Sequence, residues 1–156
     1  MIYDLIKVHI AQMDSAIKIS QIICEHSDHE ELSGDDIICG LIYRLMTPMT
    51  QEEIEQSLEK ADNILNEEEG DDEEDDEEDD EEDDEGDEED EYDTIAETYE
   101  VPTVSRKIKR NQCNCEICSR VRICLSNYES YEPTDQLAVR FKKSIQETCE
   151  KHKIYI

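Results

Sequence analysis

The chain has 156 residues, 38% of them charged, and a formal net charge of −30 at pH 7. The acids are concentrated, because residues 67–104 carry 26 Asp or Glu and no Lys or Arg, whereas residues 105–156 carry 11 basic and 6 acidic residues. This distribution argues against one evenly charged compact unit and predicts three parts, residues 1–66, 67–104 and 105–156. The longest apolar run, residues 37–43, is too short to span a bilayer, which argues against a membrane protein.

Residues 1–66 are predicted to form three helices. Over residues 3–26, apolar side chains recur at steps of three, four and seven, which is typical of one buried helical face. Ser33 and Asp36 have the spacing of a capping box before a second helix, and its apolar side chains on nearly all sides indicate a central buried element. Gly40 in that helix would permit close approach of a neighbouring backbone. A second capping box precedes a third helix, so the three faces predict a small helical bundle.

Residues 67–104 are predicted to be a disordered acidic linker. From residue 67 to residue 91 every residue is acidic except two glycines, and like charges three and four residues apart oppose a helix. No apolar side chain in this run offsets the entropy lost on ordering. Such a linker could bind a basic protein by salt-sensitive attraction, fold back on the basic end of its own chain, or act only as a solubilising spacer.

Residues 105–156 are predicted to fold as a helical hairpin. One helix is expected around residues 117–128, although strand-like alternation also occurs there, and a stronger helix is expected over about 135–152. A short turn-rich connector favours antiparallel packing, which would place the start of the first helix beside the end of the second. A part of this size would be only marginally stable without a cross-link such as a bound metal ion.

The spacing of cysteine and histidine predicts a zinc site, which would provide such a cross-link. Cys115 and Cys118 have C-x2-C spacing, Cys149 and His152 have C-x2-H spacing, and thirty residues lie between the two pairs. Two ligand pairs that a fold brings together suit a closed, tetrahedral, structural Zn²⁺ site. The predicted fold class is therefore mostly α, with an N-terminal bundle, an acidic linker and a zinc-pinned C-terminal hairpin.

Several alternatives remain open for these ligands. Cys113 could replace Cys115 in the first pair, and Cys124 could replace His152 in the second. Cys149 could instead be an ordinary buried residue. A redox switch among the three clustered cysteines is a further, less favoured alternative.

The remaining cysteines and histidines are interpreted as structural. His26 and His29 lie three residues apart beside acids and could bind a metal, but no third ligand is near them in the sequence. They are therefore interpreted as a solvated helix end, and Cys24 and Cys39 are interpreted as core residues. No secretory signal is evident at the start of the chain, so reduced thiols in an intracellular setting, the cytoplasm or the nucleus, are expected.

The C-terminal part is basic and is a candidate nucleic-acid-binding surface. The candidate contacts are Arg106, Lys107, Lys109, Arg110, Arg120 and Arg122. Basic patches often contact phosphates, and a basic pentamer can serve as a nuclear address. The alternative is an ordinary solvated helix face. Because few aromatic side chains nearby could stack on bases, base-specific recognition is not expected.

Motifs for catalysis are absent from the sequence. It has no Gly-rich phosphate loop, no G-x-S-x-G, no H-E-x-x-H and no deaminase signature. We therefore expect a non-enzymatic, zinc-stabilised interaction protein that binds basic proteins or nucleic acid. The second hypothesis is a regulator whose polyanion imitates nucleic acid toward a basic partner. A metal-dependent enzyme with a three-ligand, water-bearing ion is the least favoured.

Both ends of the chain also resemble a family. The segments SGDDIICGLIYRLMTPMTQEEI, NCEIC and YEPTDQLAVRFKKSIQETCEKHKIYI resemble small uncharacterised acidic proteins of large cytoplasmic DNA viruses of the mimivirus kind. The resemblance skips the acidic run. It implies a viral source and a host-cytoplasm setting, with the nucleus or the virion as further expected locations, and it adds no catalytic residue.

Overall fold

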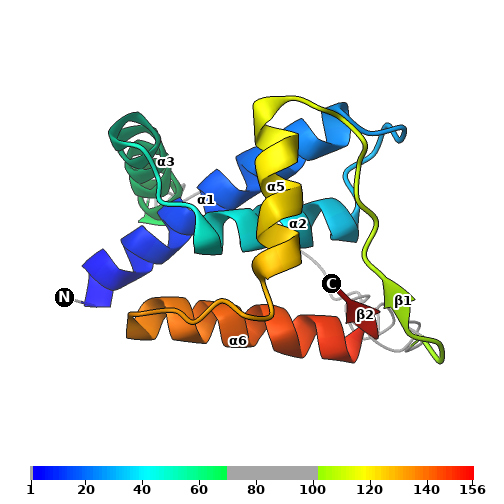
Figure 1. Cartoon of the computed structure of the whole chain (residues 1–156). Coiled ribbons are helices and arrows are strands. Elements are labelled where there is room, and N and C mark those ends of the chain that lie inside the picture. Colours follow the sequence, from blue (N-terminus) through cyan, green and yellow to red (C-terminus); the bar gives the residue numbers. More distant parts are fainter. Residues whose placement is uncertain (1, 70–101) are drawn as a thin grey trace, which may run out of the picture.

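The computed structural model describes residues 2–69 and 102–156 (Figure 1). In chain order its elements are α1 (Ile2–Glu25), α2 (Gly34–Met46), α3 (Gln51–Glu69), β1 (Arg106–Lys107), α5 (Glu116–Asn127), α6 (Gln136–Lys151) and β2 (Ile154–Tyr155). The predicted mostly helical fold is confirmed. Of the linker predicted over 67–104, the first three residues continue α3, and the prediction of disorder for 70–101 lies outside the described residues.

Helix α2 is the central element of the fold. Its predicted capping box is confirmed, since the Ser33 side chain accepts from the Asp36 backbone N–H and the Asp36 carboxylate accepts from the Ser33 N–H. The helix is buried on nearly all sides. At Gly40, a Cβ would overlap the carbonyl oxygen of Ala16 and the Ser20 side chain of α1, so the predicted close approach of two backbones is confirmed.

Both ends of the chain contribute to one hydrophobic core. Its buried side chains come from α1, α2, the segment before α5, α5 and α6, and they include Ile23, Ile42, Ile108, Val121 and Phe141. In Figure 1, α5 lies across α2, and α6 runs along the side of the molecule opposite the start of α5. The parts 1–66 and 105–156, predicted from their charges as separate units, therefore pack against each other.

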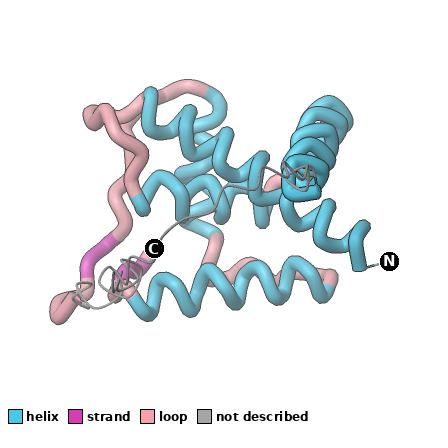
Figure 2. The backbone as a smooth tube through the Cα atoms, turned by 180° about the vertical axis from the view of Figure 1, so that it is seen from behind, coloured by secondary structure: helices cyan, strands magenta, loops and turns pink. Residues whose placement is uncertain are grey.

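The arrangement of α5 and α6 differs from the antiparallel hairpin expected from the sequence. Each of the two helices packs against α2, and the two views in Figures 1 and 2 show them running in different directions. The physical reason is that the apolar faces of α5 and α6 are covered by the nearly all-round apolar α2. The start of α5 and the end of α6 consequently lie at different places in the fold.

The segment that leads to the cysteines is held by α2 and by the C-terminus. Strand β1 pairs in parallel with β2, with Arg106 opposite Ile154. The Arg106 guanidinium donates two hydrogen bonds to the Asp35 carboxylate, at 2.7 and 2.9 Å, and the Lys109 N–H donates a third at 2.8 Å. None of the helices in the described part of the chain combines the length and apolar character that a membrane span requires.

The Asp35–Arg106 pair predicts a pH-dependent contribution to stability. Burial opposes ionisation of Asp35, but the hydrogen bonds from Arg106 and Lys109 outweigh it, so the pKa of Asp35 is lowered. A carboxyl with a lowered folded-state pKa stabilises the fold above its unfolded pKa of about 3.9, and this stabilisation is lost as the pH falls through the folded pKa. We expect Asp35→Asn to lower the free energy of unfolding by about 1–3 kcal/mol at pH 7.

Urea denaturation followed by circular dichroism across the acidic pH range checks this expectation. The exposed acid Asp28 provides the control variant Asp28→Asn, which makes the same chemical change without a buried partner. The difference in free energy of unfolding between the wild type and Asp35→Asn should shrink below about pH 4. A difference that is independent of pH, or equal to that of Asp28→Asn, would contradict the assignment.

Candidate metal site

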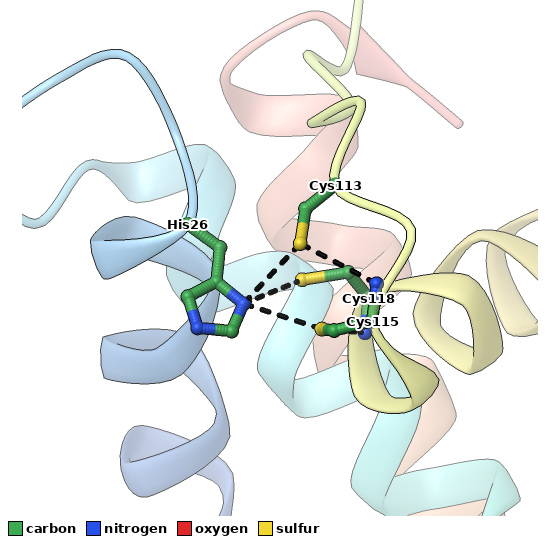
Figure 3. Close-up of side chains that lie close together, drawn as sticks. All are labelled: His26, Cys113, Cys115 and Cys118. Atoms are coloured by element: carbon green, nitrogen blue, oxygen red, sulfur yellow. Dashed lines mark hydrogen bonds between the residues drawn. The ribbon is translucent and has the colours of Figure 1, made fainter.

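Three cysteines and one histidine converge at one point of the fold (Figure 3). The ligating atoms of His26, Cys113, Cys115 and Cys118 all lie within 4.8 Å of one another. The His26 Nδ1 atom lies 3.2 Å from Cys115 Sγ and 3.5 Å from the sulfurs of Cys113 and Cys118. The cluster therefore joins the end of α1 to the start of α5.

Local backbone structure explains how these side chains meet. His26 directly follows α1, and its N–H still donates to the Ile22 carbonyl at 3.1 Å, so it keeps the helical path. Cys115 is the N-cap of α5, and its sulfur accepts the N–H of Cys118 in the first helical turn. Cys113 lies just before the cap, where its sulfur accepts the Cys115 N–H. The C-x-C-x2-C spacing thus turns three sulfurs toward one side of a helix start.

Hydrogen bonding alone does not account for this grouping. A single imidazole nitrogen carries at most one hydrogen, yet three sulfurs surround the same Nδ1 atom. A tetrahedral ion with bonds of about 2.3 Å to sulfur and about 2.0 Å to nitrogen would set each sulfur about 3.5 Å from the nitrogen. The observed separations of 3.2–3.5 Å match that arrangement. The four residues could therefore hold a metal ion.

Hydrogen bonds from Asn111 and Arg122, which lie outside the cluster, hold its Cys118 side chain in place. Asn111 donates from its amide nitrogen to Cys118 Sγ at 3.1 Å and to the Ile23 carbonyl at 3.4 Å. The Arg122 guanidinium in turn donates to the Asn111 carbonyl and side-chain oxygens, at 3.0 and 3.2 Å. Such outer contacts fix the orientation of metal ligands and are usual around metal sites.

The electrostatics of the cluster favour ionisation of one thiol. The hydrogen bond from the Cys118 backbone N–H, at the start of α5, lowers the pKa of Cys115 to about 6. Burial raises the pKa of Cys118 to about 11. Cys115 is therefore ionised at neutral pH without an ion, and the Cys118 thiol would lose its proton when a metal binds.

The cluster contains only part of the ligand set predicted from the sequence. Cys115 and Cys118 are members, and Cys113, predicted as an alternate, is the third. Cys149 is buried in the hydrophobic core, and His152 caps the C-terminal end of α6. Among the described residues neither belongs to a metal-binding group, because α6 packs on α2 and its end does not reach the start of α5.

The structure also places the other predicted alternate, Cys124, and the candidate ligand His26, which was not predicted. Cys124 is buried on α5, with its sulfur 3.7 Å from the Thr47 hydroxyl. His26 is exposed at a helix end, as expected, but it also faces the three cysteines, which the sequence interpretation missed. The available signal was that C-x-C-x2-C is one ligand short of a tetrahedral set, which called for a fourth donor elsewhere.

A second group of potential ligands is better explained as a helix cap. Atoms of Cys24, His29 and Asp36 lie within 4.8 Å of one another. However, His29 Nε2 is only 2.6 Å from Asp36 Oδ2, closer than the roughly 3.3 Å expected for two ligands of one tetrahedral ion. The same carboxylate oxygen accepts hydrogen bonds from the N–H and hydroxyl of Ser33. This group therefore fixes the start of α2.

The basic residues proposed to contact nucleic acid are partly engaged within the fold. Arg106 pairs with Asp35, and the exposed Arg120 pairs with Glu116 at 2.8 Å. Lys107 and Lys109 are exposed. Arg110 and Arg122 bind neutral oxygen atoms, those of Ser126 for Arg110 and of Asn111 and Ser119 for Arg122.

Comparison of the chain with protein-family models, with curated proteins and with solved structures gave no match. Its function is therefore inferred from its own residues.

The unequal pKa values of the thiols predict unequal reactivity. In reduced, metal-free protein at pH 7, iodoacetamide should alkylate Cys115 faster than Cys118 and Cys39, because the thiolate is the nucleophile. Cys118 and Cys39, whose pKa values are raised to about 11 and about 12 by burial, provide slow internal references. Peptide mapping by mass spectrometry gives the relative rates, and equal labelling of Cys115 and Cys118 would contradict the assignment.

Proposed function

We propose that the protein is a non-enzymatic interaction protein stabilised by one structural Zn²⁺, held by His26, Cys113, Cys115 and Cys118. The observation that carries this proposal is the convergence of three sulfurs on one imidazole nitrogen at separations of 3.2–3.5 Å. Three thiolates and one imidazole are a common ligand set of structural zinc and suit soft or borderline ions better than Mg²⁺ or Ca²⁺. Four protein ligands leave no position for a reacting water, which supports a non-catalytic role.

The proposed ion acts as a staple between distant parts of the sequence. His26 and Cys115 are 89 positions apart, and residues 70–101 lie between them along the chain. Closing so long a loop costs conformational entropy, and the free energy of metal binding offsets that cost in a small helical core. The reduced thiols that such a site needs fit the expected intracellular setting, the host cytoplasm or nucleus, or a virion.

The charge distribution supports two classes of partner. The 26 acids of residues 67–104 would attract a basic protein by diffuse, salt-sensitive forces. The basic residues around α5 and β1 are the part of the chain suited to the phosphates of nucleic acid. The second candidate function, a polyanion that imitates nucleic acid toward a basic partner, is favoured by the net charge of −30.

A pair of histidine variants tests the zinc site. His26→Asn should lose the metal, because three sulfurs alone do not complete the site, and its free energy of unfolding should fall by about 4 kcal/mol or more. His152→Asn, which alters the ligand expected from sequence spacing, should keep one zinc per chain. Elemental analysis after dialysis gives the metal content, and chelator should lower the melting temperature of the wild type but not of His26→Asn. Metal loss from His152→Asn with retention in His26→Asn would refute the assignment.

Neutralising the acidic run tests the partner classes. We expect that a variant with every Asp and Glu of residues 71–91 replaced by Asn and Gln no longer binds a lysine-rich peptide, because the attraction depends on the summed charge. The same variant should bind duplex DNA more tightly than the wild type at low salt, since its own polyanion no longer competes. Fluorescence anisotropy with both labelled ligands measures the two effects. Unchanged peptide binding would exclude the acidic run as the contact with a basic protein. If neither the variant nor the wild type binds DNA, nucleic acid is excluded as a partner.

A further inference from the structure

We propose that the outer surface of α5 carries a phosphate-binding site formed by Arg110, Arg122, Ser119 and Ser126. The inference rests on the proposed function, because it names the surface through which a phosphate-bearing partner would bind the zinc-stabilised fold. The shared chemistry is a phosphate oxyanion, whether free or in the backbone of a nucleic acid.

The site is a shallow hollow on the solvent side of α5. It has a volume of about 400 Å³ and is lined by Ser119, Arg122, Ile123, Ser126 and Asn127. Arg110 reaches its edge from the segment before α5, where its Nη1 donates to Ser126 Oγ at 3.3 Å. The Arg122 Nη2 atom donates to Ser119 Oγ, also at 3.3 Å. Each hydroxyl of the hollow therefore has a guanidinium beside it.

Within residues 2–69 and 102–156, neither of these two guanidinium groups has an acidic partner. Among the residues that the structure describes, the ion pairs include neither Arg110 nor Arg122, and the partners of both are neutral oxygen atoms. The Arg110 Nε atom is also buried, and it has no hydrogen-bond partner in the part of the chain that the structure describes. A planar guanidinium with free donors favours a carboxylate or a phosphate, and two beside hydroxyl groups match the several oxygens of a phosphate.

The acidity of the whole chain does not exclude an anion at this place. At physiological ionic strength the screening length is about 8 Å, so charges near the hollow dominate. Residues 105–156, the part of the chain that contains the hollow, carry 11 basic and 6 acidic residues. Because the hollow is open and no aromatic side chain lines it, it suits contact with a phosphate group rather than recognition of a base.

A chain of hydrogen bonds connects the hollow to the candidate metal site. Arg122 donates to both oxygens of Asn111, and Asn111 donates to Cys118 Sγ. An ion that fixes Cys118 thereby orients Asn111, and Asn111 holds the Arg122 guanidinium at the hollow. Zinc and phosphate should consequently bind with positive coupling, and thermodynamic linkage makes the coupling reciprocal.

The test uses the full zinc-loaded chain and compares Arg110→Gln with Arg140→Gln. Arg140 is exposed on α6, so its variant removes the same charge away from the hollow. Inorganic phosphate is titrated by phosphorus NMR, with acetate as the control anion, and a labelled DNA duplex is titrated by anisotropy. We expect Arg110→Gln to weaken phosphate binding about tenfold or more, and Arg140→Gln to change it about twofold or less. Weakening of both probes would identify nucleic-acid backbone as the ligand source, and weakening of phosphate alone would identify a free phosphate.

The inference fails if zinc-loaded wild type binds phosphate no better than acetate, or if the two variants behave alike. These outcomes are distinguishable from failure of the proposed function, because the zinc content of each protein is measured in parallel. Zinc-loaded protein that does not bind phosphate would refute only the phosphate-binding site. A wild-type protein that binds no zinc would refute the proposed function.

Discussion

The described fold depends on one helix that is apolar on nearly every side. Helix α2 receives α1 on one side and α5 and α6 on others, while α3 packs on α1. Gly40 lets the α1 and α2 backbones approach closely, and the buried Asp35 at the start of α2 holds the segment before the cysteines. This packing brings the end of α1 beside the start of α5, so the geometry of the candidate metal site follows from the packing around α2.

The sequence predicted local structure well, because local structure depends on local signals. The capping box at Ser33 and Asp36 and the close approach at Gly40 are properties of neighbouring residues or of helical period, and both are present. Cys115 and Cys118 belong to the cluster for the same reason, since their spacing within one helix start already brings their sulfurs together.

The candidate fourth ligand, His26, could not be predicted from the sequence, because its position depends on which helices pack together. The connector between α5 and α6 favoured an antiparallel pair, which would have brought Cys149 and His152 to the cysteines. In the structure both helices instead cover α2, whose apolar surface is large enough for each. His26, separated from Cys115 by 89 positions, then becomes the nearest imidazole. Spacing rules locate ligands within one element, whereas tertiary packing selects the partner element.

The division of charge along the chain gives the proposed roles a common physical basis. Residues 70–101 contain 23 of the 45 acids and none of the 15 basic residues, so the described part is only mildly acidic. Residues 70–101 are covalently joined to α3 and to the segment before β1, and under the proposed function this tether would let their carboxylates compete with a phosphate for the basic residues of α5. A basic partner that engages these carboxylates would lower that competition and leave Arg110 and Arg122 available to a phosphate. Binding at the acidic run and binding at α5 are therefore expected to favour each other, and both should weaken as salt is added.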